Sequence, residues 1–212
     1  RFLDDRLQLN LAAFYYDYKD FQTFQIINTA LFIENAGEVS NYGIEAELQA
    51  LVTNSFEIDA HISYQHGRIE QFLSLDPLYP YGPDGLFNTG DEKYDLKGKH
   101  LPNNPDFSGH LGAQYTWDIN GHGSLTLRGQ TYYQNETYSR AFNLDVGRQD
   151  SYTKSKIQLR FDEDKEGWYL MAGVDNIEDE DVKANIAITG TGRILANIGA
   201  PRTWYVGLGF QM

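Results

Sequence analysis

The stretch that decides the fold runs from Arg202 to Met212 and reads Arg-Thr-Trp-Tyr-Val-Gly-Leu-Gly-Phe-Gln-Met. Every second residue in it is apolar: Trp204, Val206, Leu208, Phe210 and Met212. A period of two indicates a β-strand with one apolar face. The termini of soluble proteins usually fray in water, so an apolar terminal strand favours a barrel whose outer face contacts lipid.

The same alternation recurs along the chain and predicts about eight strands of roughly ten residues, the length that a tilted strand needs to cross a bilayer. The clearest hairpin pairs residues 42–50 with residues 56–64 around a short turn at 53–55. The other predicted strands cover residues 6–18 with a continuation over 21–27, then 107–117, 125–133, 154–161, 168–174 and 203–212.

Long and short connections alternate between these strands. The long ones are 28–37, 67–105, 135–150 and 178–200, and the short ones are 53–55, 118–123 and 162–167. Outer-membrane barrels have short periplasmic turns and long extracellular loops. The sequence therefore predicts an all-β fold, an antiparallel transmembrane β-barrel segment whose chain end lies in the periplasm. A soluble β-sandwich or lipocalin-like barrel has the same period, but the loop alternation and the aromatic residues near strand ends favour the membrane barrel.

Composition limits the partners of the chain. The net charge of −13 argues against a nucleic-acid partner, and a chain without cysteine has no disulfide and no Cys-ligated metal. No apolar run approaches the roughly 18 residues of a membrane helix, which does not bear on a membrane barrel because its alternate residues face a polar lumen. No signal peptide begins at Arg1, and no local nucleophile–base–acid motif indicates an enzyme.

Five motifs, in the same order, make the chain resemble the C-terminal part of TonB-dependent outer-membrane receptors. They are Leu11–Tyr18 with its aromatic and acidic end, Asn35-Ala36-Gly37 followed by Gly43-Ile44-Glu45-Ala46-Glu47-Leu48, the Leu-Pro segment Gly98–Pro105, Val174–Asp179, and Pro201-Arg202-Thr203-Trp204. The family usually ends on Phe or Trp, whereas Met212 holds that place here.

The resemblance implies a barrel of about 22 strands with an N-terminal plug inside. Residues 1–212 would supply roughly the last eight strands, without the plug and the earlier strands. Such receptors lie in the bacterial outer membrane and import scarce ligands, such as iron–siderophore complexes, cobalamin or sugars, with energy from the TonB complex. The absent signal peptide favours this interpretation over the alternative, a self-contained small barrel that serves as a structural anchor or adhesin.

The resemblance also implies a set of partners. They are outer-membrane lipid and lipopolysaccharide, the receptor's own plug, the TonB complex through the missing N-terminal part, the barrel assembly machinery, and a small-molecule ligand such as a siderophore. The resemblance implies no cofactor and no enzymatic activity.

Four acidic residues are expected on the lumen side of the 42–64 hairpin: Glu45, Glu47, Glu57 and Asp59. The turn is expected to place Glu47 near Asp59, and like charges opposite one another destabilise a sheet. One interpretation is simple solvation by lumen water. The other is a docking surface for arginines of the plug, a role that the resemblance assigns to Glu45 in the Gly-Ile-Glu motif.

Four basic residues are expected to form a lumen stripe on neighbouring strands: Arg128, Lys154, Lys156 and Arg160. The stripe either balances acidic residues of the wall or guides an anionic ligand. A third set, Trp204, Val206, Leu208, Phe210 and Met212, resembles the signal by which barrel proteins are recognised for insertion.

The histidines do not suggest a metal site. His61 and His66 are expected on opposite faces of one strand, His61 and His110 share the lumen side, and no pair has the spacing of a zinc site. The 67–105 connection is too long to be idle. Its aromatic and acidic residues suit closure over a ligand, binding of calcium that bridges to lipopolysaccharide, or plain solvation. These residues are Tyr79, Tyr81, Phe87, Tyr94, Asp76, Asp84, Asp91, Glu92 and Asp95.

Overall fold

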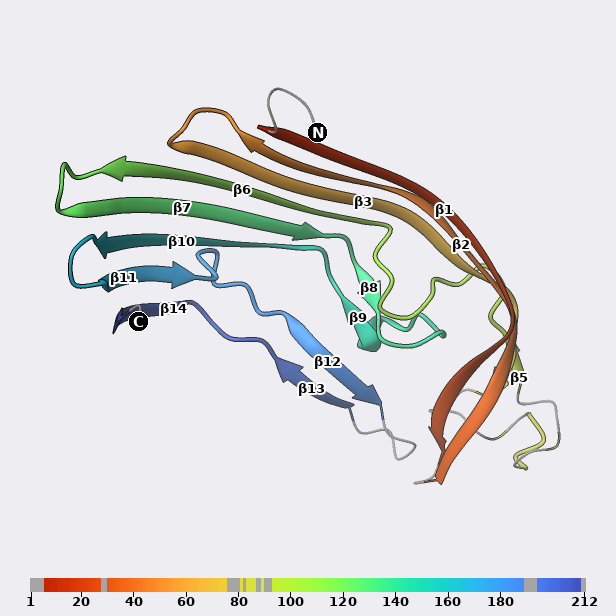
Figure 1. Ribbon diagram of the computed structural model, residues 1–212. Coiled ribbons are helices and arrows are strands. Elements are labelled where there is room, and N and C mark those ends of the chain that lie inside the picture. The colour runs from red at the N-terminus through yellow and green to blue at the C-terminus, as the bar shows by residue number, and fades with distance from the viewer. Residues whose placement is uncertain are drawn as a thin grey trace.

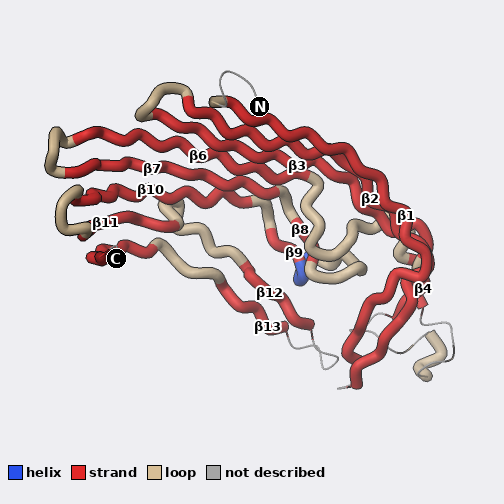
Figure 2. The backbone as a smooth tube through the Cα atoms, viewed as in Figure 1, coloured by secondary structure: helices blue, strands red, loops and turns tan. Residues whose placement is uncertain are grey.

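The computed structural model describes residues 6–27, 30–75, 81, 83–86, 89, 93–188 and 194–210. One curved antiparallel sheet of eight strands dominates it (Figures 1 and 2). In spatial order the strands are β1 (Leu7–Ile27), β2 (Ala30–Leu51), β3 (Phe56–Gln71), β6 (Phe107–Asp118), β7 (Gly123–Gln134), β10 (Tyr152–Glu163), β11 (Trp168–Asp175) and β14 (Thr203–Phe210). The predicted all-β antiparallel fold is confirmed.

Each strand of the large sheet pairs with the next large-sheet strand along the chain, so the sheet is a meander. Short turns at 52–55, 119–122 and 164–167 lie at one end, here called the turn end (Figure 1). The long connections lie at the opposite end, here called the loop end. In the second turn Asn120 and Gly121 have φ values of 39° and 75°, the left-handed conformations that tight hairpin turns require. The predicted short turns are therefore confirmed.

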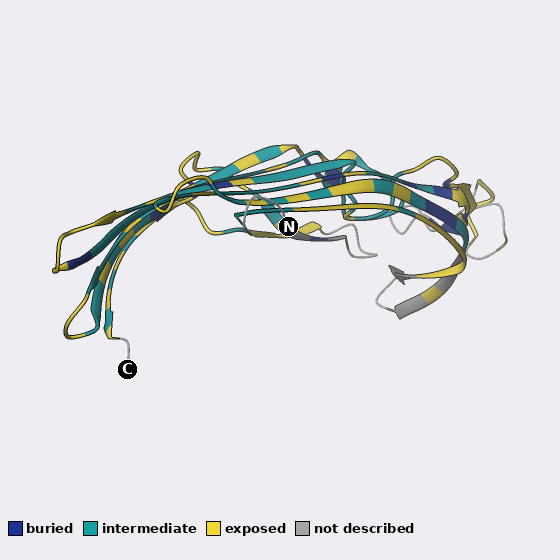
Figure 3. Ribbon diagram, turned by 45° about the horizontal axis from the view of Figure 1, so that its top comes forward, coloured by how far each residue is buried: buried dark blue, intermediate teal, exposed yellow. Residues whose placement is uncertain are grey.

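The sheet has one apolar face, because the apolar rows of neighbouring strands are in register. Leu127 lies opposite Leu159, which lies opposite Ala172, which in turn lies opposite Val206. Exposed and less exposed residues alternate along the arched strands (Figure 3). Val206 is 78% exposed, although it belongs to a regular strand. A continuous apolar surface of this kind suits contact with the hydrocarbon of a bilayer.

Aromatic side chains border the apolar face at both ends. At the loop end Phe107 lies 6.0 Å from Tyr133 between ring centroids. At the turn end Phe161 lies 5.5 Å from Trp168. Two such girdles are typical of membrane barrels, in which they mark the two interfaces with water.

The long connections differ from the prediction. The expected loop over 28–37 is mostly strand, since β2 begins at Ala30 and pairs with β1 almost to its tip. Strand β3 continues to Gln71, four residues beyond the predicted start of its loop. Outside the bilayer a strand no longer needs one lipid-facing side, so the period of two fades there although the backbone pairing continues.

The remaining long connections contain small elements of their own. They are β4 (Leu73–Leu75) paired with β5 (Lys93–Asp95), β8 (Thr137–Tyr138) paired with β9 (Arg148–Gln149), β12 (Lys183–Ile188) paired with β13 (Ile194–Ile198), and the 3-10 helix η1 (Asp145–Gly147). No helix among the described residues has the length and apolar character of a membrane span.

The long connections build a small hydrophobic core, called here the loop core. It consists of Val39, Ile69, Phe72, Leu96 and Phe142, none of which is more than 9% exposed. The first two belong to β2 and β3, and the other three come from the two connections that follow β3 and β7. Two segments far apart in the sequence are thus held against the loop end of the sheet.

Polar contacts tie the long connections to one another. The Asn143 side chain accepts a hydrogen bond from the His100 backbone N–H at 2.6 Å and donates one to the His100 carbonyl at 3.1 Å. Asn143 has a φ of 51°, a conformation that Asn tolerates better than most residues. The Gln149 side chain in turn accepts a hydrogen bond from the Lys183 backbone N–H at 2.7 Å.

The sheet is open in the part of the chain that the structure describes. Strands β1 and β14 form its two edges, and no ladder joins them. Several residues of the predictions lie outside the described part: Asp76, Tyr79, Phe87, Asp91, Glu92 and Met212.

Candidate functional site: the polar face of the sheet

The polar face lies opposite the apolar one and carries all four acidic residues expected on the lumen side. Glu45 and Glu47 project from β2, and Glu57 and Asp59 project from β3. Glu47 lies directly opposite His61, and Asp59 lies opposite Gln49, so Glu47 and Asp59 are diagonal neighbours that line the same pocket. The turn spans 52–55, and in this register none of the four carboxylates lies directly opposite another carboxylate.

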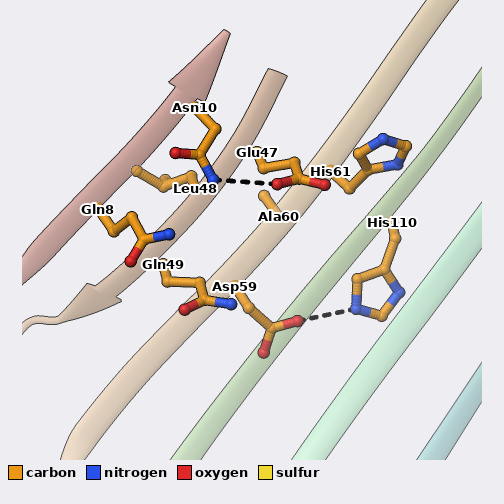
Figure 4. Close-up of a pocket in the computed structure, with 9 residues that line it drawn as sticks. All are labelled: Gln8, Asn10, Glu47, Leu48, Gln49, Asp59, Ala60, His61 and His110. Carbon is orange, nitrogen blue, oxygen red and sulfur yellow. Dashed lines mark hydrogen bonds and ion pairs between the residues drawn. The ribbon is translucent and has the colours of Figure 1, made fainter. Parts of the chain in front are cut away.

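Asp59 is the centre of a network that crosses three strands. Its Oδ1 accepts a hydrogen bond from Arg128 Nη2 at 2.6 Å, and its Oδ2 lies 2.8 Å from His110 Nε2. Figure 4 shows the His110 contact beside the shallow pocket of about 200 Å³ that residues of β1, β2, β3 and β6 line. Asp59 therefore has its countercharge on the sheet itself.

Gly112 makes this network possible. It lies on β6, directly opposite Asp59 of β3, and β6 separates β3 from β7, which carries Arg128. A Cβ atom at position 112 would stand 2.6 Å from both carboxylate oxygens. The carboxylate thus occupies the space that any larger residue would fill.

Replacing Gly112 with alanine is expected to displace the Asp59 carboxylate and to lower the free energy of unfolding by about 1–2 kcal/mol. This range is the usual contribution of a charge-assisted hydrogen bond to the free energy of unfolding, reduced because the partners are partly solvated. Urea unfolding of the complete receptor, followed by tryptophan fluorescence, measures the change. The control is Gly129→Ala on β7, where an added Cβ meets no atom within 4 Å. Equal losses in the two variants would contradict the role of Gly112.

The other three acidic residues differ in how they are satisfied. Glu47 Oε2 accepts a hydrogen bond from Asn10 Nδ2 at 3.1 Å, as Figure 4 shows. Among the described residues, Glu45 and Glu57 have no ion pair and no side-chain hydrogen bond. Of the four predicted acidic residues, Glu45 and Glu57 are therefore the two with free carboxylates.

The four predicted basic residues share the polar face, but they divide into two pairs. Arg128 is neutralised by Asp59, and Arg160 is neutralised by Asp162, with Nε to Oδ2 at 2.7 Å. The Arg160 guanidinium also lies 3.9 Å from the centre of the Tyr169 ring. Within the described residues, Lys154 and Lys156 have no ion pair.

The histidines lie where the sequence predicted. His61 and His110 are directly opposite one another on the polar face, and His66 pairs with Tyr42 on the other face. In the described part of the chain, no group of three His, Asp or Glu side chains is placed to hold a metal ion.

The connection after β3 is anchored by an ion pair at the loop end. Arg68 Nη1 and Nη2 each lie 3.0 Å from one oxygen of Asp106, and His100 Nδ1 lies 3.8 Å from the same carboxylate. Burial alone would raise the pKa of Asp106, but the hydrogen bonds and charge of Arg68 hold it below its ordinary value of 3.8. Burial and the charge of Arg68 also lower the pKa of His100 below 6.5.

This anchor is expected to weaken on acidification. The pKa of His100 is lower in the folded anchor than in the unfolded chain. The contribution of His100 to the stability of the anchor is therefore complete above about pH 6.5, and it is lost as the pH falls through the folded pKa. The loss from Asp106 follows only below pH 3.8. Hydrogen exchange of amides 96–106, corrected for intrinsic rates, should be faster at pH 5 than at pH 7.5. His100→Gln should remove that difference, whereas equal protection of the unmodified protein at both pH values would contradict the assignment.

Some structural residues escaped the sequence reasoning. Gly112 and Asn143 stand in no motif that predicts their contacts, because each depends on a segment more than 40 positions away. A glycine within a predicted strand does signal a close approach by another group, and that signal was present at position 112.

Comparisons with known proteins agree with this architecture. A family model described as TonB dependent receptor-like, beta-barrel, matches residues 1–177. The siderophore receptor PiuA from Acinetobacter baumannii is similar with a TM-score of 0.73 and 21% identity, over 99% of this chain and 26% of PiuA. The ferric yersiniabactin uptake receptor FyuA from Yersinia pestis is similar with a TM-score of 0.72 and 19% identity, over 96% of this chain and 27% of FyuA.

A structure described as a copper transporter, OprC, is also similar, with a TM-score of 0.63 and 16% identity over 97% of this chain and 28% of OprC. Identities this low show a shared fold alone. No curated protein sequence matches the chain. The chain spans about a quarter of the length of the solved structures that it matches.

Proposed function

Because the chain belongs to the TonB-dependent receptor β-barrel family, we propose that it forms the C-terminal wall of an outer-membrane receptor for active uptake of a scarce ligand. The proposed ligand is an iron–siderophore complex. The observation that carries the proposal is the open eight-stranded sheet. The chain matches a siderophore receptor over 99% of its own length and 26% of the receptor's length. The exposed apolar face and its two aromatic girdles support a location in the bacterial outer membrane.

The alternative, a self-contained small barrel that acts as an anchor or adhesin, has less support. A closed barrel leaves no free strand edge. In the described residues β1 and β14 are both edges of the large sheet. The proposed partners of the complete receptor remain the plug, the TonB complex, the barrel assembly machinery and lipopolysaccharide.

An uptake assay tests the function. A strain that lacks the whole receptor is given a panel of radiolabelled ligands: several ferric siderophores, cobalamin and a maltodextrin. Uptake of at least one ferric siderophore should be lost, should return on complementation, and should be absent from a strain without the TonB complex. Loss of cobalamin or sugar uptake alone would replace the siderophore by that ligand. Unchanged uptake of the whole panel would contradict a transport role.

The two free carboxylates are proposed to dock arginines of the plug. Glu45 is the position that matches the family motif, and Glu57 projects from the same face of the neighbouring strand, next to the turn. Both side chains are exposed in this chain, and a carboxylate pairs favourably with a guanidinium, which binds both of its oxygens. Asp59 is the weaker candidate because Arg128 and His110 already hold it.

Replacing Glu45 and Glu57 together with glutamine is therefore expected to loosen the plug. Entry of vancomycin, which is too bulky for ordinary porins, should rise several-fold in cells that carry the full-length double variant. Glu166→Gln in an exposed turn is the matched control. Susceptibility equal to that of the control, at equal receptor yield, would remove these residues from plug docking.

A further inference from the structure

Lys154 and Lys156 stand together on the polar face of β10, near the loop end. They are two positions apart in one strand, so their side chains leave the same face of the sheet. Lys154 lies opposite Tyr132, and Lys156 lies opposite Gln130. In the direction of the chain, β10 begins at the loop end and runs to the turn end, as Figure 1 shows. Both lysines therefore lie in its outer half.

The charge of these two lysines is not cancelled locally. The two arginines of the same stripe are each held by an aspartate, as described above. Asp175 is the cross-strand neighbour of Lys156, yet neither lysine forms an ion pair within 4.0 Å among the described residues. Two ammonium groups and one carboxylate leave the site with a positive balance.

The lysines line a cavity of about 460 Å³, a volume typical of small-molecule sites. Its other lining residues with polar side chains, Asp175 apart, are His110, Gln130, Thr131, Tyr132, Ser155 and Asn176, and Ala200 and Pro201 complete its rim. Asp175 is the one carboxylate in the lining. Lys154 Nζ lies 3.5 Å from the place where a Cβ of Gly199 would stand, so the glycine leaves the ammonium room beside the rim.

We propose that Lys154 and Lys156 bind an anionic oxygen group of the ligand, such as a carboxylate or a deprotonated catechol. The inference rests on the proposed function, because it assigns the site to a transported molecule. Two ammonium groups and the Gln130 side-chain amide line one cavity, and they offer hydrogen bonds that an oxygen anion can accept at several points. The Tyr132 hydroxyl and the Asn176 amide are not counted among these donors, because they already donate to Gln134 and to the backbone carbonyls of Glu180 and Ala200. A neutral ligand of the same size would leave the two cations without a partner.

The test uses the complete receptor in detergent and measures acetylation of individual lysines by mass spectrometry. Citrate, a small tricarboxylate, is the probe, and sodium chloride of equal ionic strength is the reference. Citrate should slow acetylation of Lys154 and Lys156 several-fold and leave Lys165, in an exposed turn, unchanged. Equal rates with citrate and chloride would overturn the site. Failure of both lysines to react in chloride would also overturn it, because the site would then be closed to ligand.

Two variants separate binding from a purely structural role. In Lys156→Gln, protection of Lys154 by citrate should fall several-fold, since one anion is shared by the two cations. Lys156→Arg should retain it. Unchanged protection in Lys156→Gln would exclude a shared site. The assay does not depend on transport: loss of the uptake function would leave citrate protection intact, and loss of protection would leave uptake of neutral ligands intact.

Discussion

Replacing Leu96 with alanine is expected to lower the local free energy of opening of the loop core by about 2–5 kcal/mol, the usual cost of removing a buried leucine side chain. Leu96 is only 2% exposed, and it packs with Val39, Ile69, Phe72 and Phe142. The range is wide because the cost depends on how far the surrounding side chains collapse into the cavity. No other hydrophobic cluster of buried residues holds the described long connections against the sheet.

Hydrogen exchange of amides 96–106 measures this effect. When reclosing is faster than intrinsic exchange, the exchange rate follows the equilibrium of opening, and each 1.4 kcal/mol of lost stability raises it about tenfold. The change should therefore be about thirtyfold or more. Leu86→Ala is the matched control, since Leu86 lies in the same connection and is 60% exposed. Similar exchange in the two variants would show that this connection is held by its polar contacts alone.

The outcome bears on the proposed uptake of a ligand. If the loop core is as stable as its burial indicates, the connections after β3 and β7 move as one body rather than as separate lids. Closure of residues 67–105 over a ligand, one of the three interpretations of this connection, would then require movement of the second connection as well, through the contacts of Asn143 with His100. The ligand-binding role of this segment remains a prediction.

The parts of the fold that could be predicted from the sequence are those in which the same physical constraint acts on every strand. Lipid contact imposes a period of two on the membrane-spanning part of each strand, so the eight strands and the short turns followed from alternation. The outer parts of β1 and β2 form a hairpin that does not contact lipid, so the period of two is absent there. For this reason the sequence predicts a loop over residues 28–37, although residues 30–37 belong to β2. The strands of the small hairpins β4–β5, β8–β9 and β12–β13 contain two to six residues each, which is too few for a periodic signal.

The sequence predicts on which face of the sheet the side chains of the candidate site lie, but it does not predict which of them contact one another. Alternation placed Glu45, Asp59 and Arg128 on the polar side. It did not show that Asp59 reaches Arg128, which is 69 positions away and two strands distant. That contact depends on the register of three strands and on the missing side chain of Gly112. As a result, the sequence treated the acidic residues as equivalent, whereas the structure leaves only some of them free.

Both faces of the last strand, β14, carry side chains with a defined role. On the polar side, the Tyr205 ring lies over Gly173 of the neighbouring strand and its hydroxyl donates to Gln158 Oε1 at 3.0 Å. The Tyr169 ring covers Gly209 in the same way. Because Tyr205 has these contacts, its replacement would disturb the packing of the sheet, and it is not a suitable polar-side reference for a substitution on the apolar side. Thr203, which is exposed on the polar side, is the better reference position.

Replacing Val206 with arginine is expected to lower the free energy of unfolding by about 2–4 kcal/mol, the cost of a basic residue on the lipid face near the bilayer midplane. Val206 is 78% exposed on the apolar face and lies between Trp204 and Leu208 in the same row. In lipid an arginine there would have no water to solvate it, and among the described residues its neighbours in the row, Trp204, Leu208 and Ala172, carry no carboxylate. Heat-dependent mobility of the complete receptor on gels measures the loss of stability, and its yield in purified outer membranes measures assembly.

Thr203→Arg is the control, with the same charge on the opposite face of the same strand. It should be nearly neutral, because the polar side is open to water. If the apolar row of β14 is also the signal for insertion, Val206→Arg should reduce outer-membrane yield more than the stability loss alone explains, and Phe210→Ser should reduce yield with a smaller loss of stability. Equal yields of the two arginine variants would mean that the apolar face of β14 does not contact lipid.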